Sequence, residues 1–491
     1  TARSLSRAKE VSIRKILGTE KKALISQFLT ESCLTTVLSL FIALLIVIIS
    51  LEGFNSISGK QIPLSALFQP VTIISLLTLS IVVGILAGLY PALVIAEFKP
   101  LQILKSKIGG GFRKDKFRSS LVVFQFLTSI ILIIGTMVIF RQLDYIQNKE
   151  VGFDKDQVVV IRNTNMLPNG AEIFRQRVTD LTGITSSSFA SYLPVSNSSR
   201  SDYAISTDAA LSEEKIFNAQ IWNIDYDYIP TLGIQLQEGR NFAREFGQDS
   251  TGMLINETAA RMMGLENPLG HNLFMPNIDG SISTYTIIGV IENFHFESLR
   301  HHIGPLCMRL GNNQGSVAFK ISSTDLQGLM GQIEQRWAAM STELPFSYHF
   351  LDESFDAMYH TEQRVGRVSM IFSILAIIIA CLGLFGLTTF MVEQRVKEIG
   401  VRKVLGASVQ GIITLISKDF LKLIIIAILI AMPLSWWTMN NWLANFAYRT
   451  ELTWWVFASA GLLALIIALL TVSWQAIRAA LTNPVDSLRD E

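Results

Sequence analysis

Long apolar stretches near both ends of the chain predict membrane-spanning helices. Each stretch has about 20 residues or more, enough to cross a hydrocarbon core of about 30 Å at about 1.5 Å per residue. Buried helices of a soluble protein are the alternative, but soluble helices of this length normally carry a polar face. The pattern therefore predicts a polytopic α-helical membrane protein with six transmembrane helices. The stretches without Asp, Glu, Lys or Arg are Ser32–Leu51, Val71–Ala96, Ser119–Phe140, Val368–Val392, Leu423–Tyr448 and Leu452–Ile477.

The pattern between the third and fourth stretches is that of a soluble domain. We predict one α+β domain over residues 141–367, because short β-rich runs alternate there with helical patterns. The helical pattern continues at both ends, over Arg141–Glu150 and in an unbroken helix from Asp352 into the fourth stretch, which predicts a helical stalk. Three of the β-rich runs are Gln157–Ile161, Tyr285–Val290 and Val317–Ile321.

One helix of this domain is predicted in more detail. Thr324 and Gln327 have the spacing of a capping box, so the helix is expected to start after Thr324. The residues that share its apolar face are Leu326, Leu329, Ile333 and Trp337.

The basic residues predict how the chain crosses the membrane. Twenty-two Lys and Arg lie in four segments that alternate with the spans, whereas the short loops on the other side hold only two. Cytoplasmic segments are enriched in Lys and Arg, so both termini are expected in the cytoplasm and residues 141–367 outside. The four segments are Thr1–Glu31, Glu97–Arg118, Glu393–Lys422 and the tail after Ile477.

Composition and missing motifs exclude several classes of function. The 491 residues are 16% charged with a net charge of +1, which excludes a strongly basic nucleic-acid binder. Three cysteines are too few for a disulfide framework. No G-x-x-x-x-G-K-[ST], H-E-x-x-H or G-x-S-x-G occurs, so we expect no ATP hydrolysis by this chain and no cofactor. No predicted span carries a charged residue or His, which disfavours a secondary transporter or channel.

The densest polar cluster is in the predicted external domain. In a strand, His295 and Glu297 would face one way and Glu292 the other, so we interpret this cluster as a solvated strand and loop, without a metal ion. A zinc site is the alternative, because His and Glu are zinc ligands. The cluster consists of Glu292, His295, Glu297, His301 and His302.

A segment of twelve residues occurs twice. Arg7–Gly18 aligns without gaps with Arg395–Gly406, with seven identical positions and three Val/Ile exchanges. Each copy is followed by two predicted spans. A basic helix end that only fixes topology is the alternative for either copy alone. Two copies at the same point of the topology favour a shared role.

The repeated segment resembles the signature of the FtsX-like, MacB-type permeases of ABC transporters, R-x-K-E-[IV]-x-[IV]-R-K-[IV]-L-G after a membrane span. Phrases of the external domain are similar to that family as well. The resemblance covers almost the whole chain and implies that the α+β domain is an extracytoplasmic MacB-type periplasmic core domain. The phrases are Asp225–Gly233, Glu238–Phe242, Ile255–Ala259 and Ile288–Phe296.

The resemblance also implies a division of the chain, since a family unit has a span, an external domain, a second span, a coupling segment and two closing spans. Residues 1–118 are then the remnant of a first unit, with its coupling segment and two spans. Residues 119–140 are a span, 141–367 the external domain, and 368–491 the three spans and coupling segment that complete the second unit. We expect the chain to be a fragment of an eight-span permease; a natural six-span protein is the alternative.

We predict that both copies of the repeat are coupling segments that dock on an ATPase. A short charged helix with an apolar stripe suits a groove on a partner, and the second copy has such a stripe in Ile399, Val401, Val404 and Leu405. Charges that only fix the topology are the alternative. The candidate coupling residues are Arg395, Lys397, Glu398, Arg402, Lys403, Gly406, Arg7, Lys9, Glu10, Arg14, Lys15 and Gly18.

The same segments contain helix-end signals. Gly406 is expected to supply the φ > 0 end of the coupling helix, and Ser408 to cap the helix that follows. Gly18 and Thr19 are the corresponding residues of the first copy. Within the spans, small residues favour close helix approach and proline favours a kink, although glycine is common in membrane helices anyway. The candidate packing residues are Gly84, Gly88, Pro91, Gly383 and Gly386.

By resemblance, the chain is a permease subunit that transmits the motion of a cytosolic ABC ATPase dimer to the external domain. The implied substrates are lipoproteins, peptides or drugs that are exported or extracted. The implied location is the inner (plasma) membrane, with membrane lipid and a periplasmic adaptor or outer-membrane component as further partners and no nucleic acid. The alternatives are an extracytoplasmic sensor or receptor, or a regulator of cell-wall hydrolases. A receptor is disfavoured because the longest predicted cytoplasmic segment is Thr1–Glu31.

Overall fold

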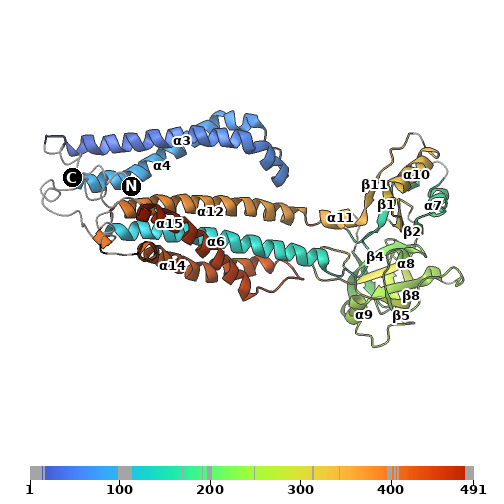
Figure 1. Cartoon of the computed structure of the whole chain (residues 1–491). Coiled ribbons are helices and arrows are strands. Elements are labelled where there is room, and N and C mark those ends of the chain that lie inside the picture. The colour runs from blue at the N-terminus through green and yellow to red at the C-terminus, as the bar shows by residue number, and fades with distance from the viewer. Residues whose placement is uncertain are drawn as a thin grey trace. The chain divides into compact units, whose positions relative to one another are not determined.

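The computed structural model forms two compact units (Figure 1), and each is described by itself. The helical unit contains residues 1–140, 363–440 and 451–491, and the mixed unit contains 141–362 and 441–450. The structure describes residues 14, 17–97, 113–167, 170–190, 192–195, 202–247, 249–311, 314–341, 343–394, 401–402, 405 and 408–481.

Long helices account for nearly all of the helical unit. Five helices in the described part of the chain are long and apolar enough to cross a membrane: Lys21–Ser58, Pro70–Leu89, Ser119–Asn148, His360–Thr389 and Trp454–Arg478. The fifth predicted stretch, Leu423–Tyr448, is helical as far as Leu443 but is not among these five, so the count of six stays a prediction. The long helices are α3 (Lys21–Ser58), α4 (Pro70–Glu97), α6 (Arg113–Asn148), α12 (His360–Gln394), α14 (Val409–Leu443) and α15 (Trp454–Leu481).

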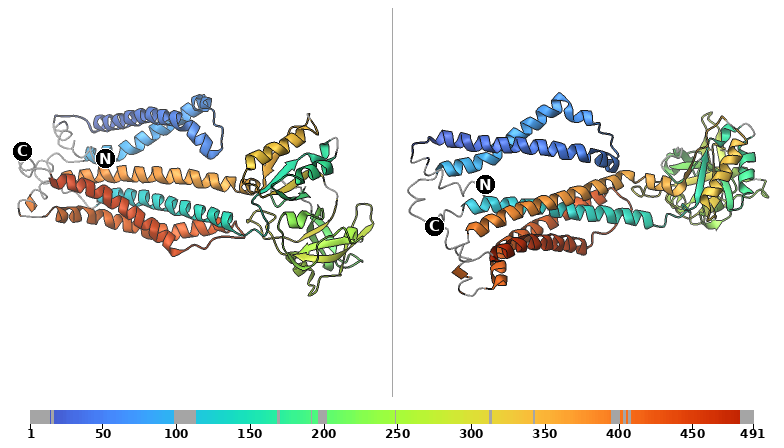
Figure 2. Two further views of the ribbon diagram at one scale, coloured as in Figure 1. Left: turned by 45° about the vertical axis from the view of Figure 1, so that its right-hand side comes forward. Right: turned by 45° about the horizontal axis from the view of Figure 1, so that its top comes forward.

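Helices α3 and α4 form a helical hairpin and lie side by side in all views (Figures 1 and 2). Gly59 ends α3 with φ 66°, a left-handed conformation that suits glycine. The Asn55 side chain then fixes the turn, because it accepts from the Ile62 amide at 3.1 Å and donates to the Ile62 carbonyl at 2.9 Å. A 3₁₀-helix, η1 (Leu64–Phe68), leads into α4.

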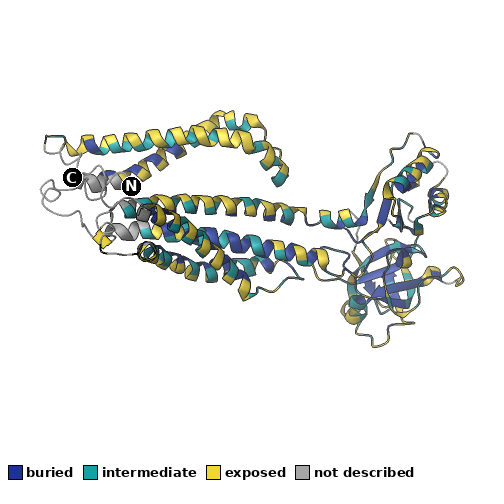
Figure 3. Ribbon diagram, in the orientation of Figure 1, coloured by how far each residue is buried: buried dark blue, intermediate teal, exposed yellow. Residues whose placement is uncertain are grey.

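The spans differ in how much of their apolar surface is buried by protein. Only 6% of the apolar window of α3 is buried, against 50% of that of α6, and Figure 3 shows the same contrast. Helix α6 packs against α12 and α14, with Thr136 and Ser373 hydroxyls 3.0 Å apart and Gly135 beside Met439. The apolar residues exposed on α3 are those expected of a helix whose solvent is lipid.

One layer of the mixed unit, called here the sheet layer, is a four-stranded antiparallel sheet with two helices on it. The strand order is β11-β1-β10-β2. Phe174, Phe319 and Trp337 are fully buried at its core, and the Phe174 and Trp337 rings meet edge to face at 5.3 Å. The elements are β1 (Val158–Arg162), α7 (Ala171–Thr179), β2 (Ile184–Phe189), β10 (Ser316–Ile321), α10 (Leu326–Ala338) and β11 (Tyr348–Phe350).

Helix α10 confirms the predicted helix but corrects its start. The N-cap is Asp325, whose side chain accepts from the Gly328 amide at 2.9 Å, so the predicted Thr324 capping box is wrong. Leu329 and Ile333 are buried as predicted, as is Trp337, whereas Leu326 is 41% exposed because it lies in the first turn.

The other layer of the mixed unit is a small closed barrel. Seven strands follow the order β5-β8-β6-β9-β4-β3-β7, and β7 also pairs with β8, which closes six of them into a ring. The long strand β8 closes it by pairing with β7 through Ile282–Thr286 and with β6 through Thr286–Ile291. The strands are β3 (Asp202–Ser206), β4 (Ile216–Ile224), β5 (Leu236–Gly239), β6 (Gly252–Asn256), β7 (Asn272–Pro276), β8 (Ile282–Ile291) and β9 (Leu306–Leu310).

Apolar side chains fill the barrel. Ile221, Ile255, Leu273 and Cys307 are buried inside it, and burial raises the pKa of the Cys307 thiol to about 12. Short helices lie at the strand ends: α8 (Tyr228–Thr231), α9 (Glu257–Met263), η2 (Thr164–Met166), η3 (Glu213–Lys215) and η4 (Asp249–Thr251).

The helices predicted as a stalk are only partly continuous. Helix α6 runs through Phe140 to Asn148 without a break. The helix predicted from Asp352 onward is divided into α11 (Leu351–Ala357) and α12, so the prediction of an unbroken helix is wrong. At the break the Tyr359 hydroxyl accepts from the Leu299 amide at 2.8 Å.

Candidate functional site

The candidate coupling residues lie mostly outside the described residues. The structure places three of them: Arg14, Gly18 and Arg402. Those outside the described part are Arg7, Lys9, Glu10, Lys15, Arg395, Lys397, Glu398, Lys403 and Gly406.

The first coupling segment ends at a glycine. Gly18 has φ 94°, and the Thr19 amide donates to the Arg14 carbonyl at 3.1 Å, the six-to-one bond of a Schellman end. The Arg14 guanidinium donates to Gln27 of α3 at 3.1 Å. Thr19 does not cap α3, because the N-cap is Glu20, so the role predicted for Thr19 is wrong.

The second coupling segment is described only at Val401, Arg402 and Leu405. Val401 and Arg402 are helical and exposed, and the Leu405 amide donates to the Val401 carbonyl at 3.0 Å. The Ser408 hydroxyl accepts from the Gly411 amide at 3.2 Å, which confirms the predicted cap of α14.

Equivalent leucines of the two copies are exposed to the same extent. Leu17 and Leu405 occupy the same position of the repeat, and each is 79% exposed. Val401, from the predicted apolar stripe, is 50% exposed. Apolar side chains this exposed beside basic residues form a surface that suits a protein partner or the lipid interface.

The candidate packing glycines of α4 lie directly on α3. A Cβ at Gly84 would lie 2.9 Å from the Cys33 Cα, and one at Gly88 would lie 2.8 Å from the Ser32 Cβ. Larger residues at either position would separate the helices. Pro91 lies inside α4, which continues to Glu97.

The two candidate glycines of α12 have different surroundings. A Cβ at Gly383 would lie 2.7 Å from the Gln125 Oε1 of α6. At Gly386 no described atom lies within 4 Å, so a side chain has room there.

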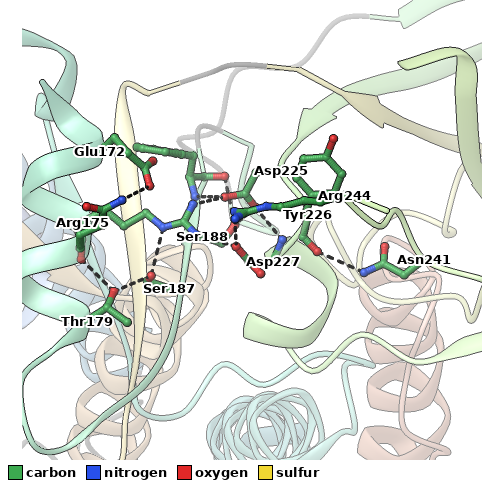
Figure 4. Close-up of polar contacts among 12 residues, drawn as sticks. Glu172, Arg175, Thr179, Ser187, Ser188, Asp225, Tyr226, Asp227, Asn241 and Arg244 are labelled. Atoms are coloured by element: carbon green, nitrogen blue, oxygen red, sulfur yellow. Dashed lines mark hydrogen bonds and ion pairs between the residues drawn. The ribbon is translucent and has the colours of Figure 1, made fainter. Parts of the chain in front are cut away.

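A partly buried ion-pair cluster joins the sheet layer to the barrel (Figure 4). The Arg175 guanidinium of α7 donates to Asp225 at 2.7 Å and to Asp227 at 2.5 Å, both just after β4. Asp225 also accepts from the Ser188 hydroxyl at 2.7 Å and the Phe189 amide at 2.9 Å, both in β2. Burial raises the pKa of the Asp225 carboxyl, against the opposing effect of these donors.

A second ion pair fixes the chain after β5. Arg240 donates to the two Asp249 oxygens at 2.9 and 2.6 Å, and the Ala243 amide donates to the same carboxylate at 2.8 Å. The Arg240 hydrogen bonds hold the pKa of Asp249 below its usual value. Each ion pair has one partner in a phrase that resembles the permease family, Asp225 in Asp225–Gly233 and Arg240 in Glu238–Phe242.

Asn256 fixes the backbone at the end of β6. Its Oδ1 accepts from the Ala259 amide at 2.9 Å, which caps α9, and from the Leu306 amide at 3.0 Å. Its Nδ2 donates to the Gly304 carbonyl at 2.9 Å, so one buried side chain holds three backbone groups.

The cluster Glu292–His302 is only partly the solvated strand and loop that we predicted: Glu292, His301 and His302 are exposed, but the cluster lies after the strand and His295 is buried. Strand β8 ends at Ile291, and His295 is only 6% exposed, with its ring edge to face with Tyr448 at 4.5 Å. Burial lowers the pKa of His295 to about 4, so the ring is neutral at neutral pH. Among the described residues, no group of three or more His, Cys, Asp or Glu is placed to hold a metal ion.

Two contacts of the mixed unit were not predicted. Arg175 is 50 residues from its partner Asp225, and Gln142 is 306 residues from its partner Tyr448. No local pattern marks Arg175 or Gln142, because each is one of several polar residues in its helix. The phrase Asp225–Gly233 did mark one member of the first pair.

Family models match both units of the chain. The model for the FtsX-like permease C-terminal matches residues 2–100 and 370–484, and the model for the MacB-like periplasmic core domain matches residues 126–321. Each FtsX match contains at least part of one copy of the repeat.

Individual relatives agree with these models. The macrolide export ATP-binding/permease protein MacB of Sodalis glossinidius is 24% identical over 300 residues, which cover 56% of this chain and 44% of that protein. The chain thus spans less than half the length of this relative.

Two solved structures show some similarity to part of the chain. The periplasmic region of MacB from Actinobacillus actinomycetemcomitans is 16% identical with a TM-score of 0.31, and covers 43% of this chain and 97% of that chain. A domain of a putative permease protein from Porphyromonas gingivalis is 15% identical with a TM-score of 0.26, and covers 40% of this chain and 88% of that chain.

Proposed function

Because the chain belongs to the FtsX-like, MacB-type permeases of ABC transporters, we propose that it couples ATP hydrolysis by a separate subunit to motion of its external domain. In this proposal the two coupling segments are the contact points for a dimeric cytosolic ATPase. The motion serves export or extraction of a lipoprotein, peptide or drug, and macrolide export is the activity in the name of the MacB relative. A periplasmic adaptor or outer-membrane component completes the path.

One observation carries the proposal. The FtsX model matches the chain twice, and the matched stretches contain Leu17 and Leu405, which are equivalent in the repeat and both 79% exposed. A conserved topology signal needs only basic residues, whereas a docking surface also needs apolar side chains that project outward. Two similar surfaces suit the two subunits of an ATPase dimer.

The proposal includes a location and a division of the chain. With the basic segments in the cytoplasm, both termini are cytoplasmic and the MacB-like domain lies outside the inner membrane. Residues 1–118 then belong to a first FtsX-like unit, and residues 119–491 form a second unit around the external domain.

The test is a triple substitution in each coupling segment. Replacing Glu398, Arg402 and Lys403 by Ala removes the charges of the second docking surface, and we expect ATPase stimulation to fall at least tenfold. The measurement is ATP hydrolysis by the purified ATPase with and without the permease in lipid nanodiscs. The equivalent first-copy variant replaces Glu10, Arg14 and Lys15.

A matched control removes similar charges elsewhere. Glu213, Glu214 and Lys215 are all exposed in η3 of the barrel, so their triple Ala variant should stimulate the ATPase like the unchanged chain. Unchanged stimulation in both coupling variants, with normal membrane insertion, would contradict the proposal and favour a sensor without a motor subunit.

A further inference from the structure

The segment between α14 and α15 belongs to the mixed unit, although both helices lie largely in the helical unit. Residues 441–450 group with residues 141–362. Two backbone hydrogen bonds attach them, from the Ala447 amide to the Arg300 carbonyl at 3.2 Å and from the Tyr448 amide to the Leu299 carbonyl at 3.1 Å. We call residues 441–450 the strap.

A buried glutamine of α6 clamps the same stretch. Gln142 is fully buried, its Nε2 donates to the Tyr448 carbonyl at 2.9 Å, and its Oε1 accepts from the Thr450 amide at 2.8 Å. Both ends of the amide therefore bind strap backbone. Loss of such a side chain leaves buried backbone groups unpaired, which is costly.

Aromatic contacts add to the clamp. The Tyr448 ring meets the buried His295 ring edge to face, with the ring centroids 4.5 Å apart, and Lys149 Nζ lies 5.2 Å from the centroid of the Tyr448 ring. The Phe446 ring is 5.2 Å from the Arg300 guanidinium, and Arg300 pairs with the buried Glu362. Aromatic–aromatic and cation–π contacts of this kind are short-ranged, so they hold only while the strap stays in place.

The strap leaves little slack between its clamped residues and the two helices. Helix α14 ends at Leu443, four residues before Ala447, and α15 begins at Trp454, four residues after Thr450. Four residues span at most about 14 Å when fully extended, at about 3.3–3.6 Å per residue. A displacement of either helix beyond that reach must move the clamped residues or break their hydrogen bonds.

From these contacts we propose that the strap is a mechanical link, through which movement of α14 and α15 reaches the base of the external domain directly. The link acts in parallel with the chain connections through α6 and α12. It rests on the proposed function, because ATP-driven movement of the helices is what it transmits. Gln142 is a positioning residue in this link, since it holds backbone groups and touches no substrate.

The first experiment tests the clamp with Gln142→Leu. This variant keeps most of the side-chain volume and removes both hydrogen bonds, so we expect the Tyr448–Thr450 amides to exchange hydrogen at least tenfold faster. The full chain in lipid nanodiscs is used, with peptide-level hydrogen–deuterium exchange as the readout. Gln147→Leu is the matched control, because Gln147 is an exposed glutamine on the same helix.

The second experiment tests the link itself. Spin labels at Glu213→Cys in the barrel and Trp454→Cys at the start of α15, in a background without native cysteines, report the distance between domain and helix. We expect one narrow distance distribution with and without ATP in the otherwise unchanged chain. In Gln142→Leu the distribution should broaden and shift when ATP and the ATPase are added. Tyr448→Ala, which keeps the Gln142 bonds, should broaden it less.

The outcomes separate the two proposals. Equal spin-label distance distributions in the unchanged chain and in Gln142→Leu would overturn the link. Equal exchange rates of the Tyr448–Thr450 amides in the two proteins would overturn it as well. A broader distribution in Gln142→Leu with no response to ATP would support the clamp but overturn the transmission and the proposed function with it. If Gln142→Leu does not insert, Tyr448→Ala gives the same comparison.

Discussion

The two layers of the mixed unit are stabilised in different ways. The sheet layer has an apolar core around Phe174 and Trp337, whereas the barrel carries buried polar side chains, such as Asn256 and Asp249, at its strand ends. All four phrases that resemble the permease family lie in the barrel or directly after its strands. Many sequences can fill an apolar core, but a buried polar side chain suits only its own partners. The phrases that resemble the family thus include Asp225, Arg240 and Asn256, whose polar contacts fix the chain at the strand ends.

The largest loss of stability is expected from a substitution in the core of the sheet layer. Trp337→Ala removes a fully buried ring and the Nε1–H that donates to the Leu344 carbonyl at 2.9 Å. We expect a loss of about 3–5 kcal/mol in the free energy of opening, because a large cavity forms. Hydrogen exchange of the β1 and β10 amides in the full chain measures it.

The loss should stay within its layer. Exchange in β6 and β9 should change little in Trp337→Ala, because the barrel has its own core. An equal loss of opening free energy in both layers would contradict separate stabilisation of the two layers. The mixed unit would then unfold as one cooperative structure.

A smaller but more specific effect is expected in the barrel. Asn256→Ala leaves three backbone groups without the partner they have in the barrel, those of Ala259, Gly304 and Leu306. We expect a loss of about 2–3 kcal/mol, since a buried group left unpaired costs about 1–3 kcal/mol. Exchange of the β6, β8 and β9 amides measures it.

An asparagine nearer the surface provides the control. Asn277 bonds to Ser281 and Ser283 in the β7–β8 turn, where water can replace its partners, so Asn277→Ala should cost under about 0.5 kcal/mol. Similar losses for Asn256→Ala and Asn277→Ala would contradict the view that buried polar contacts hold the barrel.

The smallest expected effects are opposite pH dependences of two aspartates. The pKa of Asp249 is lowered by Arg240, so its contribution to stability is present above about pH 3.8 and is lost as the pH falls through its folded value. The pKa of Asp225 is raised by burial, so protonation of Asp225 adds stability as the pH falls from neutral toward about 3.8.

Asparagine variants measured at several pH values test this contrast. On acidification the loss caused by Asp249→Asn should shrink, whereas the stability of the unchanged chain relative to Asp225→Asn should rise. Parallel trends in the two variants would show that burial does not dominate at Asp225.

Local sequence patterns were sufficient to predict the helices and strands whose buried residues recur at a regular spacing. The spacing of Leu329, Ile333 and Trp337 gave the buried face of α10. Strands β8 and β10 contain the predicted runs, and β1 contains its run except for Gln157. The cap moved from Thr324 to Asp325, because either side chain can accept at a helix start and only the folded backbone decides between them.

Pairings between distant segments could not be predicted. The barrel depends on β8 pairing with three strands, and a local run contains no sign of its neighbours. His295 was expected in solvent because it belongs to a dense polar cluster of the sequence, but Tyr448, more than 150 residues later, packs against it. The candidate coupling segments could be identified because the same twelve-residue pattern occurs twice. A repeat can be recognised in the sequence without knowing which residues are in contact.

The closed ring of strands protects Cys307 from chemical modification. The thiol is fully buried among apolar side chains, and its raised pKa leaves almost no reactive thiolate at neutral pH. Maleimide can label it only when the ring opens, so the labelling rate counts opening events in the unmodified molecule. The unit thus contains its own reporter of local unfolding, usable in living cells without any engineered probe.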